Sequence, residues 1–538
     1  MANDITADVV IIGSGVAGAL VAAELAKAGV KVAILEAGAE VDRSTAVETY
    51  WNNPIKTPES AYPNDETARH PVSQDPTGWY QQLGPDMFGS TYIKVVGGTT
   101  WHWLGTALRF VPQDFTLKTS FGVGEDWPFP YDTLEPFYTR AENELGVAGD
   151  AKADLGSPRT DPYPMPPIVQ TYLDKAFSKA LDGTDYHVAP TPQARNSQDG
   201  DRPACCGNNS CIPICPIQAK YDATVHIGRA VEAGAQLHAQ TTAVSIDVDD
   251  TGKIAKVNFT RWDGSKGTAT GKLFLLAAHA IESPRLLLNS RSERLPNGVA
   301  NSSDQVGRNL MDHPSQLSWA LANEPVYPYR GPLSTSGIEN LRDGDFRKSR
   351  GAFRIEIGND GWSWPTGAPF SDVTEFVGQG LRKDDLNKAI YDRTARQVRL
   401  ASLVEQLPLA ENRVTLSPDK KDMYGVPLPQ INFKVDAYTL DGMAAARKAH
   451  EEVFAKLGVS EFHHSDRLQG AGHIIGTLRM GTDAKTSVVD PDLRSHDHPN
   501  LFVAGSSVFP SSATANPTLT IAALSLRLAE TMKAALKT

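Results

Sequence analysis

A glycine-rich turn near the N-terminus constrains the fold more than any other feature of this chain. A fully apolar run leads into the sequence GSGVAG, in which Gly13, Gly15 and Gly18 form a G-x-G-x-x-G pattern. Apolar residues then recur at helical spacing, and a second apolar run ends at Glu36. The order strand, tight turn, helix and strand predicts a β-α-β unit and therefore an α/β domain.

This unit has the chemistry of a dinucleotide site. The glycines let the backbone approach a pyrophosphate that lies on the N-terminus of the helix. The Glu36 carboxylate, about 20 residues farther on, is placed to accept hydrogen bonds from a ribose and would repel a 2'-phosphate. The alternative is a glycine-rich turn in an ordinary α/β protein. Spacing alone does not choose between NAD and FAD.

Charge and hydropathy exclude two classes of partner. The 538 residues carry a formal net charge of -11, so the basic surface that nucleic-acid binding needs is missing. The longest apolar stretch is interrupted and contains three glycines, which is too short for a membrane-spanning helix. The residues before it are acidic, whereas a signal peptide needs a positive start, so we expect no signal peptide of this chain's own.

Four cysteines are clustered in one short segment and therefore form a local site rather than a network of disulfides that holds the chain together. They are Cys205, Cys206, Cys211 and Cys215. Thiolates suit iron–sulfur clusters, and Cys-x3-Cys-Pro is also the ending of a common iron–sulfur ligand run. Structural zinc is the alternative, but adjacent cysteines chelate one ion awkwardly, so iron–sulfur is favoured.

The rest of the chain mixes irregular, strand-like and helical stretches without an internal repeat. Composition predicts long surface excursions at 50–90 and 150–210, strands within 243–276, and helices at 436–457 and 518–536. The pair His463 and His464 is interpreted as part of a solvated loop, since no further metal ligands stand at suitable spacing.

Five motifs in order give the chain a resemblance to a known family. They are GSGVAG, VGGTTWHW at 96–103, IESPRLLLNS at 281–290, VGRNLMDHP at 306–314, and NLFVAGSSVFP followed by NPTLTIAAL. Together they resemble the glucose-methanol-choline (GMC) oxidoreductases along essentially the whole chain. The resemblance implies FAD, bound between the N-terminal and C-terminal parts of the chain.

The resemblance also implies an architecture of two domains. An FAD-binding, Rossmann-like α/β domain is expected at 1–315 and 466–538, with an inserted iron–sulfur segment near 200–220. A substrate-binding domain with an antiparallel sheet and helices, of α+β type, is expected at 316–465.

Two residues match the family's catalytic pair. His473, in GAGHIIGTLRMG, and Asn516, which precedes Pro517, stand where the family places a His and then a His or Asn. A neutral imidazole can accept the hydroxyl proton, and an amide can hold the developing alkoxide without competing as a base. Pro517 and Thr518 are expected beside the cofactor. The alternative is a buried structural His and a turn Asn.

A second loop resembles the family's flavin-contacting segment. Gly97 and Gly98 match that loop, and His102 stands where some relatives attach the flavin covalently. The covalent bond is a hypothesis, and a packed His between two tryptophans is the alternative. Gly505 replaces the Asp that much of the family has near the flavin.

The cysteine segment narrows the resemblance to the catalytic subunits of bacterial membrane-associated FAD-dependent glucose, fructose and sorbitol dehydrogenases. That similarity implies a 3Fe-4S cluster on Cys205, Cys211 and Cys215, with Cys206 available for an intermolecular disulfide to a small subunit. It also implies a multihaem cytochrome c subunit. Export would depend on the partner's signal, which places the protein at the periplasmic face of the bacterial inner membrane, with membrane contact only through a partner.

The resulting prediction is an FAD-dependent dehydrogenase that oxidises a sugar hydroxyl, with an aldose such as glucose at C1 as the first choice. A ketose, polyol or sugar acid (fructose, sorbitol, gluconate or keto-gluconate) is the alternative. Electrons would leave FADH2 through the cluster to a cytochrome c or quinone. An oxygen-using GMC oxidase and a noncatalytic flavoprotein are the rival functions. Arg479 could face a sugar-acid carboxylate, although a structural role is favoured.

Overall fold

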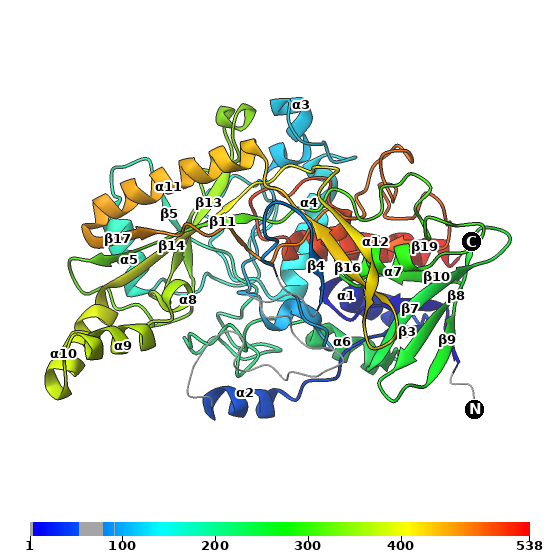
Figure 1. Cartoon of the computed structure of the whole chain (residues 1–538), viewed down its shortest axis with the longest axis horizontal. Coiled ribbons are helices and arrows are strands. Elements are labelled where there is room, and N and C mark those ends of the chain that lie inside the picture. The colour runs from blue at the N-terminus through cyan, green and yellow to red at the C-terminus, as the bar shows by residue number, and fades with distance from the viewer. Residues whose placement is uncertain (1–3, 53–78, 91, 538) are drawn as a thin grey trace.

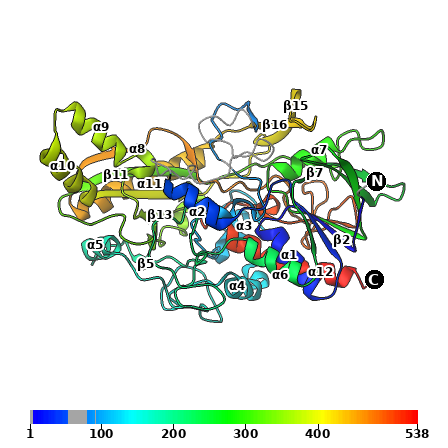
Figure 2. The ribbon, with the colours of Figure 1, turned by 90° about the horizontal axis from the view of Figure 1, so that it is seen from below.

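The computed structural model describes residues 4–52, 79–90 and 92–537, which form two sheet-based halves side by side (Figure 1). Figure 2, seen from below, keeps the same two halves apart along the long axis. The predicted combination of an α/β half and a half with an antiparallel sheet is confirmed. The long irregular segment expected at 50–90 falls largely on residues 53–78, outside the described part.

The first half is built on a parallel five-stranded sheet. In spatial order its strands are β19 (Leu501–Val503), β10 (Leu273–Leu276), β2 (Val9–Ile12), β3 (Val32–Leu35) and β6 (Gln236–His238). The sequences VVII, VAIL and LFLL are buried at every position, as expected for strands covered on both faces. The predicted β-α-β unit is therefore confirmed, with α1 (Val16–Lys27) between β2 and β3.

Helices and a second sheet cover this core. Helix α1 packs between α6 (Thr224–Glu232) and α12 (Thr518–Ala535), and α12 also packs on α4 (Tyr131–Leu145). A four-stranded sheet follows the order β1 (Ile5–Thr6), β9 (Lys266–Thr270), β8 (Ile254–Arg261) and β7 (Thr241–Val248), and a three-stranded sheet joins β15 (Arg413–Lys421), β16 (Pro427–Asn432) and β4 (Gln81–Gln82). Strands and helix thus occupy the stretches predicted within 243–276 and 518–536.

The second half is an antiparallel seven-stranded sheet. Its order is β17 (Val459–His464), β11 (Pro314–Ala322), β14 (Gln397–Val404), β13 (Phe353–Gly358), β12 (Ser336–Ile338) and β5 (Val188–Pro190), with β18 (Gln469–Gly470) also paired to β11. Helix α11 (Ala437–Leu457), as predicted at 436–457, packs on one face with α5 (Tyr172–Ala180). Strands β5 and β18 come from outside 316–465, and the predicted domain boundaries stay a prediction.

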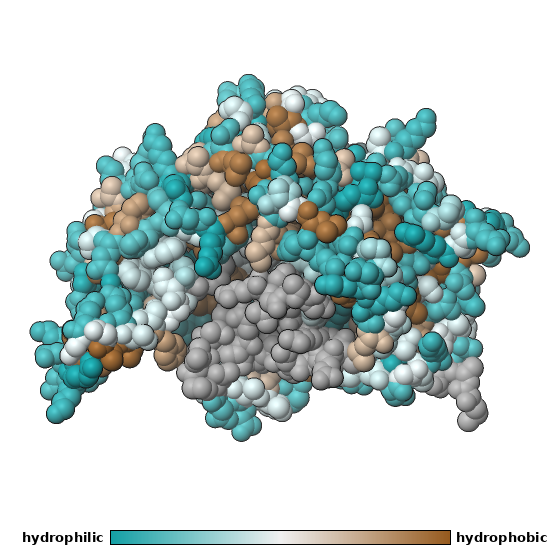
Figure 3. All heavy atoms as spheres, in the orientation of Figure 1, coloured by the Kyte–Doolittle hydropathy of each residue, from teal (hydrophilic) through white to brown (hydrophobic). Residues whose placement is uncertain are grey.

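The remaining helices are shorter or peripheral. They are α2 (Arg43–Asn52), α3 (Leu117–Phe121), α7 (Glu282–Asn289), α8 (Ser363–Thr366), α9 (Phe370–Gly378) and α10 (Lys383–Arg396). Helices α9 and α10 project from the far end of the second half (Figure 1). Within the described ranges, no helix combines the length and hydrophobicity that crossing a membrane requires. The face drawn in Figure 3 is mainly hydrophilic, with apolar residues scattered across it.

Two local expectations are wrong. The segment at 150–210 is not irregular throughout, because α5 and β5 lie within it. A capping box at the start of α5 and pairing to β12 order these elements. His463 and His464 end strand β17 rather than a solvated loop, and the His464 ring bonds Ser318 Oγ at 2.7 Å.

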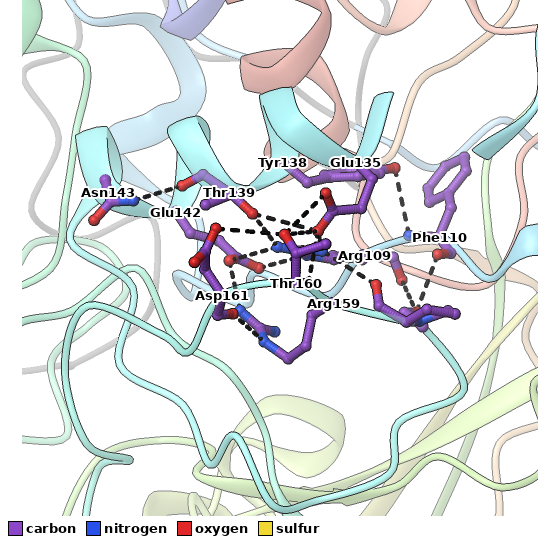
Figure 4. Close-up of polar contacts among 12 residues, drawn as sticks. Arg109, Phe110, Glu135, Tyr138, Thr139, Glu142, Asn143, Arg159, Thr160 and Asp161 are labelled. Atoms are coloured by element: carbon purple, nitrogen blue, oxygen red, sulfur yellow. Dashed lines mark hydrogen bonds and ion pairs between the residues drawn. The ribbon is translucent and has the colours of Figure 1, made fainter. Parts of the chain in front are cut away.

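A buried ion-pair cluster holds the loop before α5 against α4 (Figure 4). The Arg109 guanidinium donates to both carboxylate oxygens of Glu142, at 2.8 and 2.9 Å, and to Glu135 at 2.9 Å. Arg159 also pairs with Glu142 at 2.7 Å, and the Thr160 amide donates to Glu135. The charges are paired and hydrogen-bonded, which is the condition under which buried charges are tolerated.

Candidate active site

One large cavity separates the two halves and contains most of the predicted site residues. Its volume is about 1500 Å³, and its lining runs from Ile12 at the end of β2 to Ile521 in α12. Ligand cavities commonly measure roughly 300–1,000 Å³, so this one has room for a dinucleotide together with a substrate. Another part of the lining comes from β13 and β14, which contribute Glu356, Arg399, Ala401 and Leu403.

The glycine-rich turn forms the cofactor end of the cavity. Gly13 has a φ of +104°, and a Cβ on Gly18 would lie 2.0 Å from the Gly13 carbonyl oxygen, so α1 packs directly on the turn. A Cβ on Gly15 would meet nothing within 4 Å, while a Cβ on Gly98 would lie 3.2 Å from the Gly15 Cα. The backbone of both residues lines the cavity. This cradle, at the start of a helix, fits the pyrophosphate of FAD.

Glu36 also lines the cavity and is buried. Its carboxylate accepts hydrogen bonds from the Ser14 amide at 3.0 Å, the Ser14 hydroxyl at 2.6 Å and the Gly38 amide at 2.9 Å. Burial raises the pKa of Glu36, and the Ser14 and Gly38 donors oppose this shift. The position suits the predicted contact with a ribose.

The remaining predicted cofactor residues divide into lining and supporting positions. Pro517 and Thr518 line the cavity at the start of α12, so a second helix N-terminus contributes to its wall. His102 lines the cavity too, and its covalent attachment to the flavin stays a prediction. Gly97 is not among the lining residues. It directly precedes Gly98 with a φ of +94°, and its backbone amide donates a hydrogen bond to Ser14 Oγ at 3.1 Å.

The predicted catalytic pair meets at the cavity wall. His473 follows β18 and Asn516 precedes α12, and the Asn516 Nδ2 lies 3.2 Å from the His473 Nε2. Both residues line the cavity. Two segments that are separated in the sequence thus present an imidazole nitrogen and an amide to the same space.

The hydrogen-bond partners assign the tautomer of His473. His313 Nε2 faces the carbonyl oxygens of Ser512 and Ala513, at 3.0 and 2.9 Å, so this nitrogen must carry the hydrogen. In neutral His313 the Nδ1 is then an acceptor, and it lies 2.7 Å from the His473 Nδ1. His473 therefore donates through Nδ1, which leaves a lone pair on Nε2, the nitrogen beside Asn516.

The surroundings keep His473 neutral. Burial, followed by the nearby His313 and Arg354, lowers the pKa of His473 well below the ordinary 6.5. An imidazole in this state is a proton acceptor across the physiological pH range.

Arg354 orients the amide of Asn516. Its Nη1 donates to the Asn516 Oδ1 at 3.5 Å, and its Nε and Nη2 bond Glu339 at 3.0 and 2.8 Å. A guanidinium can only donate, so Oδ1 faces Arg354 and Nδ2 faces His473. The positive charge of Arg354 beside Oδ1 also polarises the amide, which makes Nδ2 a better hydrogen-bond donor to a negatively charged oxygen.

Asp312 holds the histidines from the backbone side. Its Oδ1 accepts from the His313 and His473 amides at 2.6 and 2.9 Å, and its Oδ2 accepts from Ser90 Oγ. Sequence reasoning missed Asp312, His313 and Arg354 as site residues. The motif VGRNLMDHP at 306–314 carried a signal for the first two, whereas no local pattern distinguishes Arg354 in β13.

Two further residues from the sequence analysis have structural partners. Arg479 bonds the Thr486 carbonyl at 3.0 Å and Glu125 at 3.3 Å, and it is not a lining residue of the cavity. The structural role favoured for Arg479 is consistent with these contacts. Gly505 lines the cavity with a φ of +105°.

The four cysteines surround a second, much smaller cavity. Cys211 is buried, Cys205 and Cys215 are half-buried, and Cys206 is exposed. Arg195 Nη2 donates to the Cys211 Sγ at 3.1 Å. The donor atoms suit an iron–sulfur cluster, but within the described residues no group of three or more His, Cys, Asp or Glu side chains is assembled closely enough to hold a metal ion.

The cysteine segment adjoins the large cavity. Asn209 and Ile212 line the large cavity, while Cys211 between them lines the small one. Buried Lys220 donates to the Trp101 and Trp103 carbonyls at 2.8 and 2.6 Å, which ties the segment after the cysteines to the loop that carries His102.

Comparisons with known proteins agree with this geometry. Two models described as GMC oxidoreductase match residues 71–315 and 408–525, and a model described as FAD dependent oxidoreductase matches 8–55. The chain is 38% identical to the fructose dehydrogenase large subunit of Gluconobacter japonicus, over 98% of both chains. It is 28% identical to paromamine 6'-oxidase of Streptomyces fradiae, over 97% of this chain and 90% of the relative.

More distant matches extend the comparison. The gluconate 2-dehydrogenase flavoprotein of Pantoea cypripedii is 25% identical, over 96% of this chain and 92% of the relative. Among solved structures, pyridoxine 4-oxidase from Mesorbium loti has a TM-score of 0.61 with 17% identity, covering 98% of this chain and 99% of the other. A formate oxidase has a TM-score of 0.64 with 16% identity, covering 99% of both chains. These structures share the fold.

Proposed function

Because this chain belongs to the GMC oxidoreductase family, an FAD-dependent family that acts on sugar or alcohol hydroxyls, we propose that it is a sugar dehydrogenase with His473 as its base. The observation that carries the proposal is the lone pair on His473 Nε2, which accepts from Asn516 Nδ2 at 3.2 Å and lies at the wall of a cavity large enough for cofactor and substrate.

The two side chains suit the removal of a hydroxyl proton. A substrate hydroxyl between them would donate to His473 Nε2 and accept from Asn516 Nδ2. As the proton moves to Nε2, negative charge develops on the oxygen, and the amide dipole held by Arg354 stabilises it. FAD, when bound, supplies the acceptor for the hydride that leaves the carbinol carbon.

The substrate is proposed to be a sugar, and two choices of sugar are in view. Oxidation of an aldose such as glucose at C1 is the first prediction from the sequence. The 38% identity to a fructose dehydrogenase large subunit favours a ketose as a second candidate. Polyols and sugar acids are further candidates, and the flavin-reduction assay described below compares them with the two sugars.

We further propose an iron–sulfur cluster, with Cys205, Cys211 and Cys215 as ligands, as a route for single electrons to a cytochrome c or quinone. The cysteine segment supports this route because Asn209 and Ile212 line the large cavity while Cys211 lines the small one. Exposed Cys206 would pair with a small subunit, and a multihaem cytochrome c would complete a complex at the periplasmic face of the bacterial inner membrane. The name of the Gluconobacter relative, a large subunit, supports a multi-subunit assembly.

The test is to mix the enzyme anaerobically with glucose, fructose, sorbitol or gluconate and to measure the rate of flavin reduction from the flavin absorbance. His473→Ala should slow flavin reduction by roughly 10²- to 10⁴-fold with the best sugar, since this is the usual contribution of a general base. A rate within a few-fold of the unaltered enzyme would overturn the assignment of the base. Rapid flavin reoxidation by oxygen would favour an oxidase.

A separate measurement tests the cluster. Iron and sulfide analysis together with electron paramagnetic resonance of the purified protein should reveal an oxidised 3Fe signal that the substrate bleaches. Zinc in place of iron, or iron that substrate does not reduce, would contradict the electron route while leaving the flavin chemistry intact.

A further inference from the structure

The cavity-facing side of the seven-stranded sheet carries a row of alternating charges. Side chains alternate along β13, so Ile355 and Ile357 enter the hydrophobic core while Arg354 and Glu356 face the other way. Glu356, Asp360 and Arg399 all line the large cavity. The row begins at the catalytic end, because Arg354 Nη1 contacts both Asn516 and Glu356 at 3.5 Å.

A glycine makes room for the far end of this row. Gly358 on β13 pairs with Arg399 on β14, and a Cβ on Gly358 would lie 2.3 Å from Arg399 Nη2. The Arg399 guanidinium therefore lies flat over the strand, where its Nε bonds Asp360 at 2.9 Å. In this position it reaches Glu356 only at 3.8 Å.

Glu356 differs from the other carboxylates of the row in its contacts. Glu339 and Asp360 make short, charge-assisted bonds of 2.8 and 2.9 Å. The contacts of Glu356 with described residues are 3.5 Å to Arg354 and 3.8 Å to Arg399, although the residue is only 6% exposed. A buried carboxylate normally accepts short hydrogen bonds, so the acceptor capacity of Glu356 is incompletely used.

We propose that Glu356 accepts hydrogen bonds from substrate hydroxyls next to the carbon that is oxidised, and so selects neutral polyhydroxy substrates. Glu356 and Asn516 both contact Arg354 Nη1, so a hydroxyl held by Glu356 and a hydroxyl at the catalytic pair are within reach of neighbouring positions on one sugar. This inference rests on the proposed function, and it names the substrate class of the same site.

The charges of the row favour neutral sugars over sugar acids. Of the charged residues of the row that line the cavity, two are carboxylates, of Glu356 and Asp360, and one is a guanidinium, of Arg399. A substrate carboxylate placed here would meet Glu356 and Asp360 at short range, and like charges in a buried site repel strongly. Sugar acids are therefore expected to be poor substrates.

The test is the Glu356→Gln variant of the FAD-loaded enzyme, assayed by anaerobic flavin reduction with D-fructose, D-glucose, D-gluconate and 2-propanol. Gln keeps the size of the side chain and removes the charge, and Arg354 and Arg399 keep Glu339 and Asp360 as partners. We expect the KM for the better neutral sugar to rise roughly 10- to 100-fold, the usual effect of losing a hydrogen bond to a charged group. The limiting rate should change less, and 2-propanol, which has no second hydroxyl, should react with unchanged efficiency.

Two further variants separate binding from folding. Glu356→Asp, which keeps the charge, should recover part of the affinity for the sugar. Glu451→Gln removes a charge from α11, which packs on the opposite face of the same sheet, and should leave every parameter within a few-fold. Thermal unfolding and flavin content show whether each variant is folded.

The outcomes are distinguishable. If Glu356→Gln is folded and its KM for the sugars is unchanged, or if gluconate is the best substrate of the unaltered enzyme, the selection by Glu356 is refuted. If no sugar reduces the flavin of the unaltered enzyme, the proposed function itself fails. Equal loss of efficiency with 2-propanol and with the sugar would also refute the proposal, because it would indicate a general disturbance of the site.

Discussion

The tautomer of His473 depends on one acceptor, the Nδ1 of His313, and replacing that residue tests the whole hydrogen-bond chain. In His313→Leu the His473 Nδ1–H loses the partner that lies 2.7 Å away. An unsatisfied buried donor costs about 1–3 kcal/mol, and the imidazole can avoid this cost by moving its hydrogen to Nε2. In that tautomer Nε2 cannot accept the substrate proton.

The expected loss of rate follows from this cost of an unsatisfied donor. Because about 1.4 kcal/mol corresponds to a factor of ten, the ratio of the reactive tautomer to the other one should fall roughly 5- to 150-fold. The limiting rate of anaerobic flavin reduction, measured by stopped flow with the best sugar, should fall by up to this factor, whereas KM should change little. His313→Asn offers an amide oxygen near the position of Nδ1 and should retain more of the rate.

Flavin content and thermal unfolding serve as controls, since His313 also bonds the Ser512 and Ala513 carbonyls. A folded, flavin-loaded His313→Leu enzyme that reduces its flavin at the unaltered rate would refute the tautomer assignment. A rise in KM with an unchanged limiting rate would do so as well, because it would indicate a role in binding only.

Three further outcomes are expected. Flavin reduction should not decline between pH 7 and about pH 5.5, because the pKa of His473 lies well below 6.5 and the ring stays unprotonated as the pH falls; a loss with an apparent pKa near 6.5 would contradict this. Gly15→Val places a side chain in the cofactor cradle and should lower bound FAD at least tenfold by absorbance, whereas Gly228→Ala, on α6 with open space around it, should not. Arg109→Met breaks a buried ion-pair cluster and should lower the free energy of unfolding by about 3–5 kcal/mol in denaturant titration, while Lys118→Met, in an exposed pair, should cost less than about 1 kcal/mol.

The parts of the fold that were predictable have local causes. The β-α-β unit with Gly13 and Glu36 is encoded in about 30 consecutive residues, and hydropathy and turn chemistry are sufficient to identify it. The helices α5 and α11 differ in this respect. Helix α11 is 21 residues long, whereas the 9 residues of α5 are too few to form a stable helix alone and depend on a capping box and on tertiary packing inside a polar stretch.

In the candidate site, too, some residues could be predicted from local sequence and others depend on tertiary structure. His473 and Asn516 could be paired because each lies in a recognisable motif. Arg354 and Glu356 could not, because their position in the site is set by strand pairing between β13 and β14 and by which face of the sheet turns toward the cavity. Sheet register joins residues that are distant in the sequence, and one sequence without such pairings does not reveal it.

The five-stranded sheet joins β2 and β3 to β19, which lies almost 500 residues farther along the sequence. Strand β19 covers the edge of β10, and α12 packs on α1 and brings its N-terminus to the cofactor cavity. About 500 residues separate the glycine-rich turn from the start of α12, so the cavity lacks this wall until that part of the chain has been made. Until then the β10 edge is an open template for wrong pairing. Flavin retention should therefore report on whether β19 and α12 have closed on the earlier part of the fold.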